Sequence, residues 1–190
     1  EALNRGMKPI PKTIEGLLSV VDTKDNPMTS RKIKLGKELF FDPILSRDKT
    51  INCASCHLLN NGGDDNKPTA IGFHNRANPS HLNSPTVLNA ALQKYQFWNG
   101  SAKDVEEQAG GPIQAPFEMN MTPAEAIKRL KANSHYVEKF QNVFNVDDAI
   151  TFENIKKAIG AYERTLLTRG AYDDFLDGNN NAMSEKAKKG

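Results

Sequence analysis

The sequence has little cysteine, with only two in 190 residues, three positions apart. This number excludes the disulfide framework that is typical of small secreted domains. Long blocks of charge of one sign are also missing, and 25 Lys and Arg nearly balance 23 Asp and Glu to give a net charge of +2. No nucleic-acid-binding surface is therefore indicated.

Long hydrophobic runs are missing as well. The longest uninterrupted apolar stretches are only a few residues, so the sequence predicts no membrane span. The start, EALNRGMKP, lacks the hydrophobic core of a signal peptide, as expected for an exported protein whose signal has been removed. Hydrophobic content is 38%, so a bulky apolar cofactor would help to fill the core.

Helical spacing of apolar residues dominates the second half of the chain. Residues 122–125 read TPAE, a capping box with proline at the first helical position. Further helical runs start near Tyr136 and after Thr151, and an earlier one covers residues 30–42. Because no run alternates between apolar and polar residues, we predict an all-α protein with long ordered loops and little or no sheet.

One long segment, from residue 60 to residue 85, is crowded with Gly, Asn, Pro and Asp. An irregular segment of this length is uncommon inside a compact domain and is often functional. A simple surface excursion is the alternative interpretation. His74 and His81 lie in the segment, which favours a function.

The two cysteines belong to the pattern C-x-x-C-H, formed by Cys53, Cys56 and His57. This pattern is the attachment signature of c-type haem. On one helical turn, two thiols three residues apart can form thioethers with the two vinyl groups of one porphyrin. The adjacent His57 then faces the iron, so the sequence predicts covalent haem c with His57 as its proximal ligand.

Two other interpretations of the pattern were weighed. A thioredoxin-like redox pair requires a βαβ setting, and a zinc site requires two further ligands at matching spacing. The sequence provides neither setting.

Haem alone does not separate an electron carrier from an enzyme. A permanent strong ligand on the distal side of the iron favours electron transfer, whereas an open or displaceable position permits chemistry. The candidate distal ligands are His74, His81, His135 and the five methionines.

Several blocks beyond C-x-x-C-H occur in a fixed order. They are KLGKELFFDPILSRDKTINCASCH, GGDDNKPTAIG, NSPTVLNAA, QFWNGSAKDVEEQAGGPIQAPFEM and AIGAYERTLLT. From about Leu35 to the end, the chain closely resembles the N-terminal half of bacterial dihaem cytochrome c peroxidases, a group that includes the MauG-like enzymes.

The resemblance implies a cytochrome c-like peroxidatic haem domain over residues 29–183, preceded by an N-terminal arm over 1–28. Residues 184–190 then begin the connection to a second haem domain. It also implies a periplasmic bacterial cytochrome c peroxidase that reduces hydrogen peroxide to water. Electrons come through the second c-haem domain from a small cytochrome or cupredoxin donor, calcium lies at the domain interface, and a homodimer is compatible with the pattern.

The resemblance implies catalytic roles for three residues. Trp98 in FWNG matches the tryptophan between the two haems. Gln108 in EEQA and Glu118 in PFEM match the distal pair that handles peroxide. A buried Glu118 would have a raised pKa and would move a proton between the oxygens of peroxide, while Gln108 would position the substrate.

The resemblance also implies metal-binding roles for three further residues. His74 matches the displaceable distal ligand of the haem iron, and Asn83 in NSPTV matches an asparagine associated with calcium. The family often has histidine straight after the glycine of this loop, whereas Phe73 intervenes here, so His81 is the second candidate.

The chain lacks a second C-x-x-C-H and the methionine ligand of a second haem. Inactivity of this half by itself is therefore one expectation. The alternative functions are a monohaem electron-transfer cytochrome c and MauG-like long-range oxidation of another protein. A non-haem structural domain is a third alternative.

Overall fold

Residues 3–189 are described by a computed structural model. They divide into two compact units. One unit contains residues 22–166, and the other combines residues 3–21 with residues 167–189. The expected arm, haem domain and connection had other boundaries and stay predictions, and their outermost residues 1–2 and 190 lie outside the described residues.

The larger unit is built from helices and irregular chain. The helices are α2 (Ser30–Phe41), α3 (Cys53–Cys56), α4 (Val105–Gln114), α5 (Pro123–Lys131), α6 (Ser134–Phe144) and α7 (Phe152–Glu163), with short 3-10 turns η2 (Pro43–Leu45), η3 (Phe73–Asn75) and η4 (Ala90–Leu92). Within residues 3–189, β structure is limited to three isolated bridges. The prediction of an all-α protein is confirmed.

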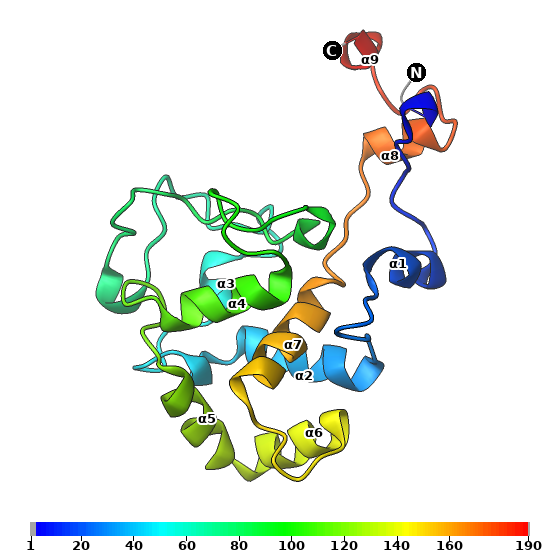
Figure 1. The fold of residues 1–190 in the computed structure, drawn as a ribbon. Helices are drawn as coiled ribbons and strands as arrows, with labels where there is room; N and C mark the ends of the chain where they lie inside the picture. The colour runs from blue at the N-terminus through cyan, green and yellow to red at the C-terminus, as the bar shows by residue number, and fades with distance from the viewer. Residues whose placement is uncertain (1–2, 190) are drawn as a thin grey trace. The chain divides into compact units, whose positions relative to one another are not determined.

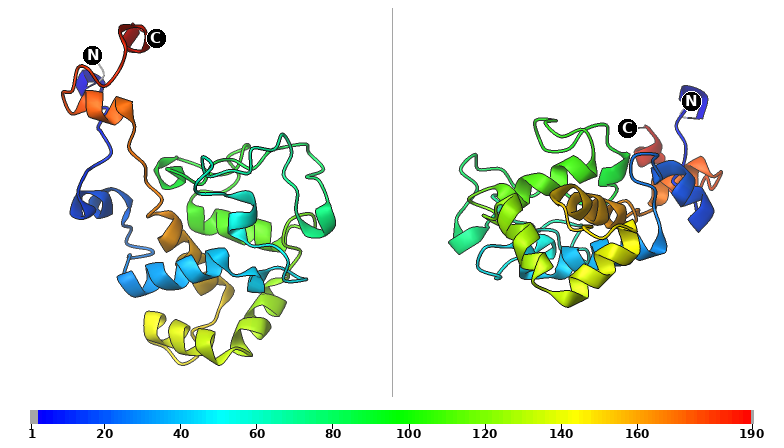
Figure 2. Two further views of the ribbon diagram at one scale, coloured as in Figure 1. Left: turned by 180° about the vertical axis from the view of Figure 1, so that it is seen from behind. Right: turned by 60° about the horizontal axis from the view of Figure 1, so that its bottom comes forward.

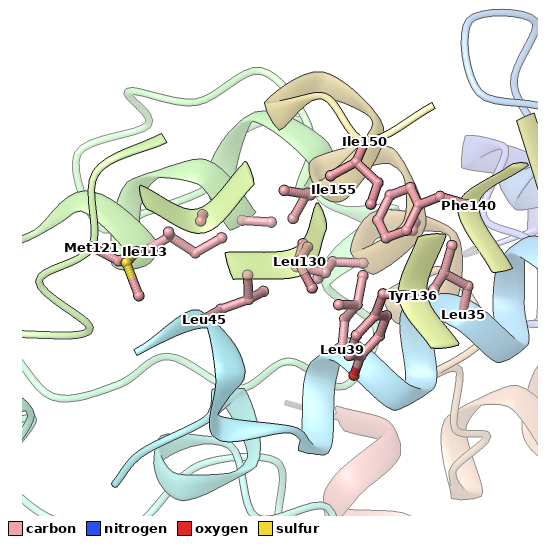
Figure 3. Packing of buried hydrophobic residues seen from close by; sticks show 14 of the residues in the cluster. Leu35, Leu39, Leu45, Ile113, Met121, Leu130, Tyr136, Phe140, Ile150 and Ile155 are labelled. Carbon is pink, nitrogen blue, oxygen red and sulfur yellow. The ribbon is translucent and has the colours of Figure 1, made fainter. Parts of the chain in front are cut away.

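Helices α2 and α7 pack against each other at the centre of this unit. Figure 1 shows α5 and α6 on one side of the pair, and α3, α4 and the irregular chain on the other side; Figure 2 shows the same arrangement from behind. Side chains from α2, α4, α5, α6 and α7 form one apolar core, part of which Figure 3 shows. Leu39, Phe140 and Ile155 are completely buried in it.

Gly36 permits the close approach of α2 and α7. A Cβ atom at this position would lie 1.8 Å from the carbonyl oxygen of Ala158. Since this neighbour is backbone, it cannot move aside as a flexible side chain would. The two helices can therefore pack at this distance only because residue 36 has no side chain.

We expect Gly36→Ala to lower the free energy of unfolding by at least 1–3 kcal/mol, roughly the cost of overpacking a core. Urea unfolding followed by circular dichroism measures the change. Gly170→Ala is the matched control, because a Cβ there would meet nothing within 4 Å. Equal stability of the Gly36 variant and the wild type would contradict this account of the helix pair.

Helix ends agree with the sequence patterns. Asp42 follows α2, and Pro43 begins η2, as predicted from the proline. Thr122 and Glu125 form the expected capping box of α5, with Pro123 at the first helical position. The irregular segment 60–85 contains only one 3-10 turn.

Helix α4 was not predicted as a separate element, because GGP inside it opposes helix formation. Asp104 caps its start by accepting a hydrogen bond from the backbone N–H of Glu107 at 2.8 Å. Val105 and Ile113 are buried, and α4 packs on α7. Tertiary packing therefore outweighs the local preference against a helix.

The smaller unit contains α1 (Ile14–Val21), α8 (Ala171–Leu176), α9 (Glu185–Lys189) and the 3-10 turn η1 (Leu3–Arg5). Polar contacts join its two chain segments. The backbone N–H of Ile10 donates to Asp173 at 2.7 Å, and Lys12 pairs with Asp177 at 2.9 Å. Across residues 3–189, no helix has the length and apolar character needed to cross a bilayer.

Candidate haem site

The C-x-x-C part of the motif is the single turn α3. Asn52 accepts a hydrogen bond from the backbone N–H of Ser55, and the Ser55 hydroxyl accepts one from the N–H of Asn52, both at 3.0 Å. Asn52 also donates to the carbonyl of Phe41 at 2.6 Å, at the end of α2. Asn52 before the turn and Ser55 within it therefore fix the turn that presents Cys53 and Cys56.

His57 ends this turn with one of its ring nitrogens already engaged. Its Nδ1 lies 3.2 Å from the carbonyl oxygen of Gly63, which the following loop brings back to the ring. Burial lowers the pKa of His57 although the ring donates to a backbone carbonyl, so the imidazole is neutral at physiological pH. A neutral imidazole with Nδ1 bound to a carbonyl has Nε2 free to ligate a metal.

Two adjoining cavities meet at His57. The main cavity has a volume of about 390 Å³, and the second has about 350 Å³. Most of the lining of the main cavity is apolar. Eight residues line both cavities: His57, Asn83, Ser84, Pro85, Phe97, Trp98, Gln108 and Glu163. Their size and lining are typical of a pocket for a large organic cofactor.

The thiols of Cys53 and Cys56 line the main cavity. Burial raises the pKa of both thiols above the ordinary value, so they are protonated in this environment. Reactive cysteines need a lowered pKa, which these do not have. Among residues 3–189, no group of three or more His, Cys, Asp or Glu side chains could hold a metal ion, so neither a zinc site nor a dithiol redox centre is favoured.

Glu118 lies in the turn after α4 and lines the main cavity. Its carbonyl accepts a hydrogen bond from the N–H of Phe73 at 2.8 Å. These two segments of the chain pass so closely that a Cβ atom on Gly72 would lie 2.3 Å from the carbonyl oxygen of Phe117. Desolvation by burial raises the pKa of Glu118, as the sequence analysis expected for a buried position.

Gln108 reaches the same cavity from the middle of α4. Pro112, four residues later, has no N–H to donate to the Gln108 carbonyl, yet the helix continues to Gln114. The carbonyl of Pro112 accepts the N–H of Met119 at 3.0 Å, which folds the following turn back on α4. Because the chain folds back in this way, Glu118 in the turn reaches the same cavity as Gln108 in α4.

Trp98 lies at the tip of a loop closed by the bridge between Gln96 and Ala102. Its indole N–H donates to the carbonyl of Asn83 at 3.3 Å, and the residue is 63% exposed although it lines both cavities. The preceding Phe97 has a left-handed φ of 64°, which is uncommon for an aromatic residue. The loop therefore holds the only tryptophan at the rim of the cavities.

His74 and His81 do not line either cavity. The His74 side chain is 63% exposed, and its Nε2 lies 3.8 Å from the carboxylate of Asp48. Phe73 takes the buried position beside Gly72, and the His74 ring stacks on it at 3.9 Å. Ligation of the iron by His74, or by His81 as second candidate, requires a rearrangement of this loop and stays a prediction.

Of the other candidates for a distal ligand, His135 and Met121 lie away from the cavities, whereas Met119 lines the main cavity. His135 is exposed at the start of α6 and lies 3.1 Å from the carboxylate of Glu38. Met121 is buried in the apolar core, and Met119 is buried and lines the main cavity. Asn83, the predicted calcium ligand, lines both cavities, and its carbonyl accepts the Trp98 indole.

Sequence reasoning missed Glu163, which lines both cavities from the end of α7. It is only 6% exposed. Glu163 lies in the block AIGAYERTLLT, and the signal that was available is an acidic residue inside an otherwise apolar helical run. Burial raises the pKa of its carboxyl to about 8, with repulsion from Glu106 adding to the effect and Arg164 opposing it.

A buried ionic network was also missed. The Arg164 guanidinium donates to both carboxylate oxygens of Glu106, at 2.8 and 2.7 Å, and Asn26 donates to the same carboxylate at 2.7 Å. Lys32 donates to Asn26 at 2.9 Å. Burial opposes the charge on Glu106, but these hydrogen bonds outweigh it and lower its pKa.

The residues present fit a covalently attached haem. The two cysteine side chains and the imidazole of His57 come from one five-residue segment, residues 53–57, and line one largely apolar cavity. Nδ1 of His57 is bound to a carbonyl, as is usual for an imidazole that ligates a metal through Nε2. Cys53, Cys56, His57, Asn83, Trp98, Gln108 and Glu118 are thus brought together, whereas His74 and His81 are not.

Comparison with known families agrees with this geometry. The family model described as di-haem cytochrome c peroxidase matches residues 30–181. Among curated proteins, cytochrome c551 peroxidase from Pseudomonas aeruginosa is 40% identical over 185 residues, which are 96% of this chain and 51% of that protein. Methylamine utilization protein MauG from Methylorubrum extorquens is 39% identical over 173 residues, which are 90% of this chain and 48% of that protein.

A solved structure also matches. It is a MauG-like protein associated with microbial copper homeostasis, with a TM-score of 0.76 and 30% sequence identity over 88% of this chain and 49% of that chain. The chain thus spans about half the length of the relatives that it matches.

Proposed function

The chain belongs to the di-haem cytochrome c peroxidase family, and on that basis we propose that it is the half that reduces hydrogen peroxide to water at a c-type haem. One observation supports this most strongly. The C-x-x-C-H turn, the carboxyl of Glu118 and the amide of Gln108 line a single cavity. An electron carrier has no need of an acid–base group beside its cofactor.

When bound, the haem supplies redox chemistry that accepts two electrons from donors and passes them to peroxide, which consumes two protons and releases two water molecules. Glu118 provides proton transfer for this reaction. Its carboxylate accepts a proton from one oxygen of hydrogen peroxide and returns it to the other oxygen, which leaves as water. The raised pKa of Glu118 makes its conjugate acid a better match for proton exchange near neutral pH.

Gln108 contributes without exchanging protons. Its side-chain amide offers both a donor and an acceptor, and these orient peroxide in the cavity. The apolar lining of the cavity limits the water around the substrate, so each hydrogen bond to it is stronger than in bulk solvent.

Trp98 is proposed as the entry point for electrons. Its position at the cavity rim and its 63% exposure fit a side chain that a second haem domain covers. A small cytochrome or cupredoxin is proposed to reduce that second domain. Asn83, whose carbonyl holds the Trp98 indole, is proposed to bind calcium at the same interface with ligands from the second domain. The whole protein is proposed to work in the periplasm, and a homodimer is compatible with this proposal.

Spectroscopy of the chain, produced in a host that attaches c-type haem, tests the proposal. We expect a Soret band that survives acid–acetone extraction, because thioethers hold the haem. We also expect peroxide consumption once a reduced small cytochrome supplies electrons, with the distal position of the iron vacated. An iron that stays six-coordinate in both oxidation states and inert to peroxide would instead support the monohaem electron carrier.

The similarity to methylamine utilization protein MauG favours a test of the alternative that the family resemblance implies, the long-range oxidation of another protein. That activity would oxidise side chains of a protein substrate, and mass spectrometry of the substrate would detect it. Peroxide turnover with a small redox donor and no protein substrate distinguishes the peroxidase.

A further inference from the structure

Glu163 is a buried acid that the proposed peroxide chemistry does not use. It is only 6% exposed, yet it lines both cavities around His57. No hydrogen bond joins its carboxyl to another residue in the part of the chain that is described. A carboxyl that faces a cofactor cavity without a partner needs a proton in order to stay buried.

The neighbouring Arg164 does not neutralise Glu163, because its guanidinium is bound to another carboxylate. Two of its nitrogens donate to Glu106, and both partners are buried. Glu106 therefore holds the negative charge, and its repulsion disfavours a second charge on Glu163. Two buried carboxyls whose environments separate their titration in this way are typical of a site that exchanges protons.

The other groups around Glu163 do not compensate its charge. Cys53, on α3, is neutral as the thioether proposed above, and it is also neutral as a free thiol, whose pKa is raised by burial and by Glu163. Burial and Glu163 likewise raise the pKa of the Tyr162 hydroxyl, which therefore stays neutral. Across the second cavity lie His57 and the carboxylate of Asp64. The cation of Lys32 is connected through Asn26 to Glu106 and not to Glu163.

From this arrangement we infer that Glu163 is a second proton-exchanging residue of the haem cavity, which takes up a proton when the bound haem takes up an electron. The inference rests on the proposed binding of haem at this site. It assigns Glu163 a role separate from that of Glu118, because Glu163 couples reduction of the cofactor to protonation, whereas Glu118 transfers a proton between the oxygens of peroxide.

The balance of this step is simple. One electron passes from a one-electron reductant to the haem, and one proton passes from a hydronium ion of the solvent to a carboxylate oxygen of Glu163. One O–H bond of hydronium breaks, one O–H bond forms on the carboxyl, and a water molecule is left. Burial in the cavity already raises the pKa of Glu163 to about 8. Since the added electron makes the cavity more negative, reduction of the haem raises this pKa further. At a pH between the pKa of Glu163 with oxidised haem and its pKa with reduced haem, reduction is accompanied by uptake of a proton. The reduction potential therefore falls as pH rises in this range.

Redox titration of the haem-loaded chain, with dithionite as reductant, tests this inference from about pH 6 to about pH 10. We expect the midpoint potential of the wild type to fall with pH above roughly pH 8 and that of Glu163→Gln to stay level in the same window. Glu153→Gln is the matched control, because Glu153 lies on the same helix with its side chain 55% exposed. It should keep the pH dependence of the wild type.

A level wild-type potential, or a pH dependence that survives in Glu163→Gln, would overturn the inference while leaving haem binding intact. A chain without covalent haem would overturn the proposed function and this inference together. If Glu163→Gln does not fold, reduced-minus-oxidised infrared spectra of the wild type at about pH 9 decide the question. A new carbonyl band of a protonated carboxyl is expected on reduction, and its absence would contradict proton uptake.

Discussion

Replacement of Glu118 by Gln is expected to lower the rate of hydrogen peroxide reduction by about 10²–10⁴-fold, which is the usual contribution of a general acid–base group. The amide has nearly the shape of the carboxyl and cannot shuttle a proton. Haem attachment should not change, because Glu118 is distant in sequence from the C-x-x-C-H turn and its backbone hydrogen bonds remain. Stopped-flow measurement of peroxide consumption, with the Soret band as a measure of haem content, checks both expectations.

Glu138→Gln is the matched control, because Glu138 is exposed on α6 and lines neither cavity. This variant should turn over peroxide at the rate of the wild type. Unchanged turnover in a Glu118→Gln protein with full haem content would remove Glu118 from the mechanism.

The pH dependence of the same reaction is expected to follow the ionisation of Glu118. Its carboxylate must accept a proton, so the rate should fall as pH falls through the pKa of Glu118. Burial raises that pKa, and the acid limb therefore lies above the pH at which an exposed glutamate titrates. The limb should be absent from Glu118→Gln. An acid limb at the ordinary glutamate pKa would contradict a desolvated position.

The double substitution Cys53→Ala and Cys56→Ala is expected to abolish covalent haem attachment completely. The two buried thiols are the only cysteines of the chain, so no other residue can form a thioether. Haem staining of a denaturing gel, together with the mass of the intact protein, measures attachment. Each single substitution should keep one thioether, and therefore a stained band.

Ala54→Ser is the control for the double substitution, since it changes the motif without removing a thiol. It should keep both links. Haem that stays bound to the double variant under denaturing conditions would show that the attachment chemistry is wrong, and with it the assignment of the whole site.

Local sequence patterns predicted some of the helix ends correctly. They did not predict which elements pack together in space. The capping box around Thr122 and the proline at position 43 act within a few residues, so their effect can be read from the sequence. Helix α4 could not be predicted in this way. Its GGP segment opposes a helix locally, and burial of Val105 and Ile113 reverses the outcome.

The site divides in the same manner. Cys53, Cys56 and His57 are recognised because their chemistry requires a fixed spacing within five residues. Glu163 is far from them in sequence, and only the packing of α7 brings it to the cavity. His74 fits the family pattern in sequence, but the additional Phe73 takes the buried position and directs the histidine outward.

The hydrogen bond between Phe73 and Glu118 links the candidate distal-ligand loop to the proton-transfer residue. A Cβ atom at Gly72 would lie 2.3 Å from the carbonyl oxygen of Phe117, so the two segments can lie this close only because residue 72 has no side chain. An inward shift of the loop that carries His74 would therefore also displace the backbone that holds Glu118. Exchange of the distal ligand and the position of the proton-transfer residue would then be coupled through the main chain.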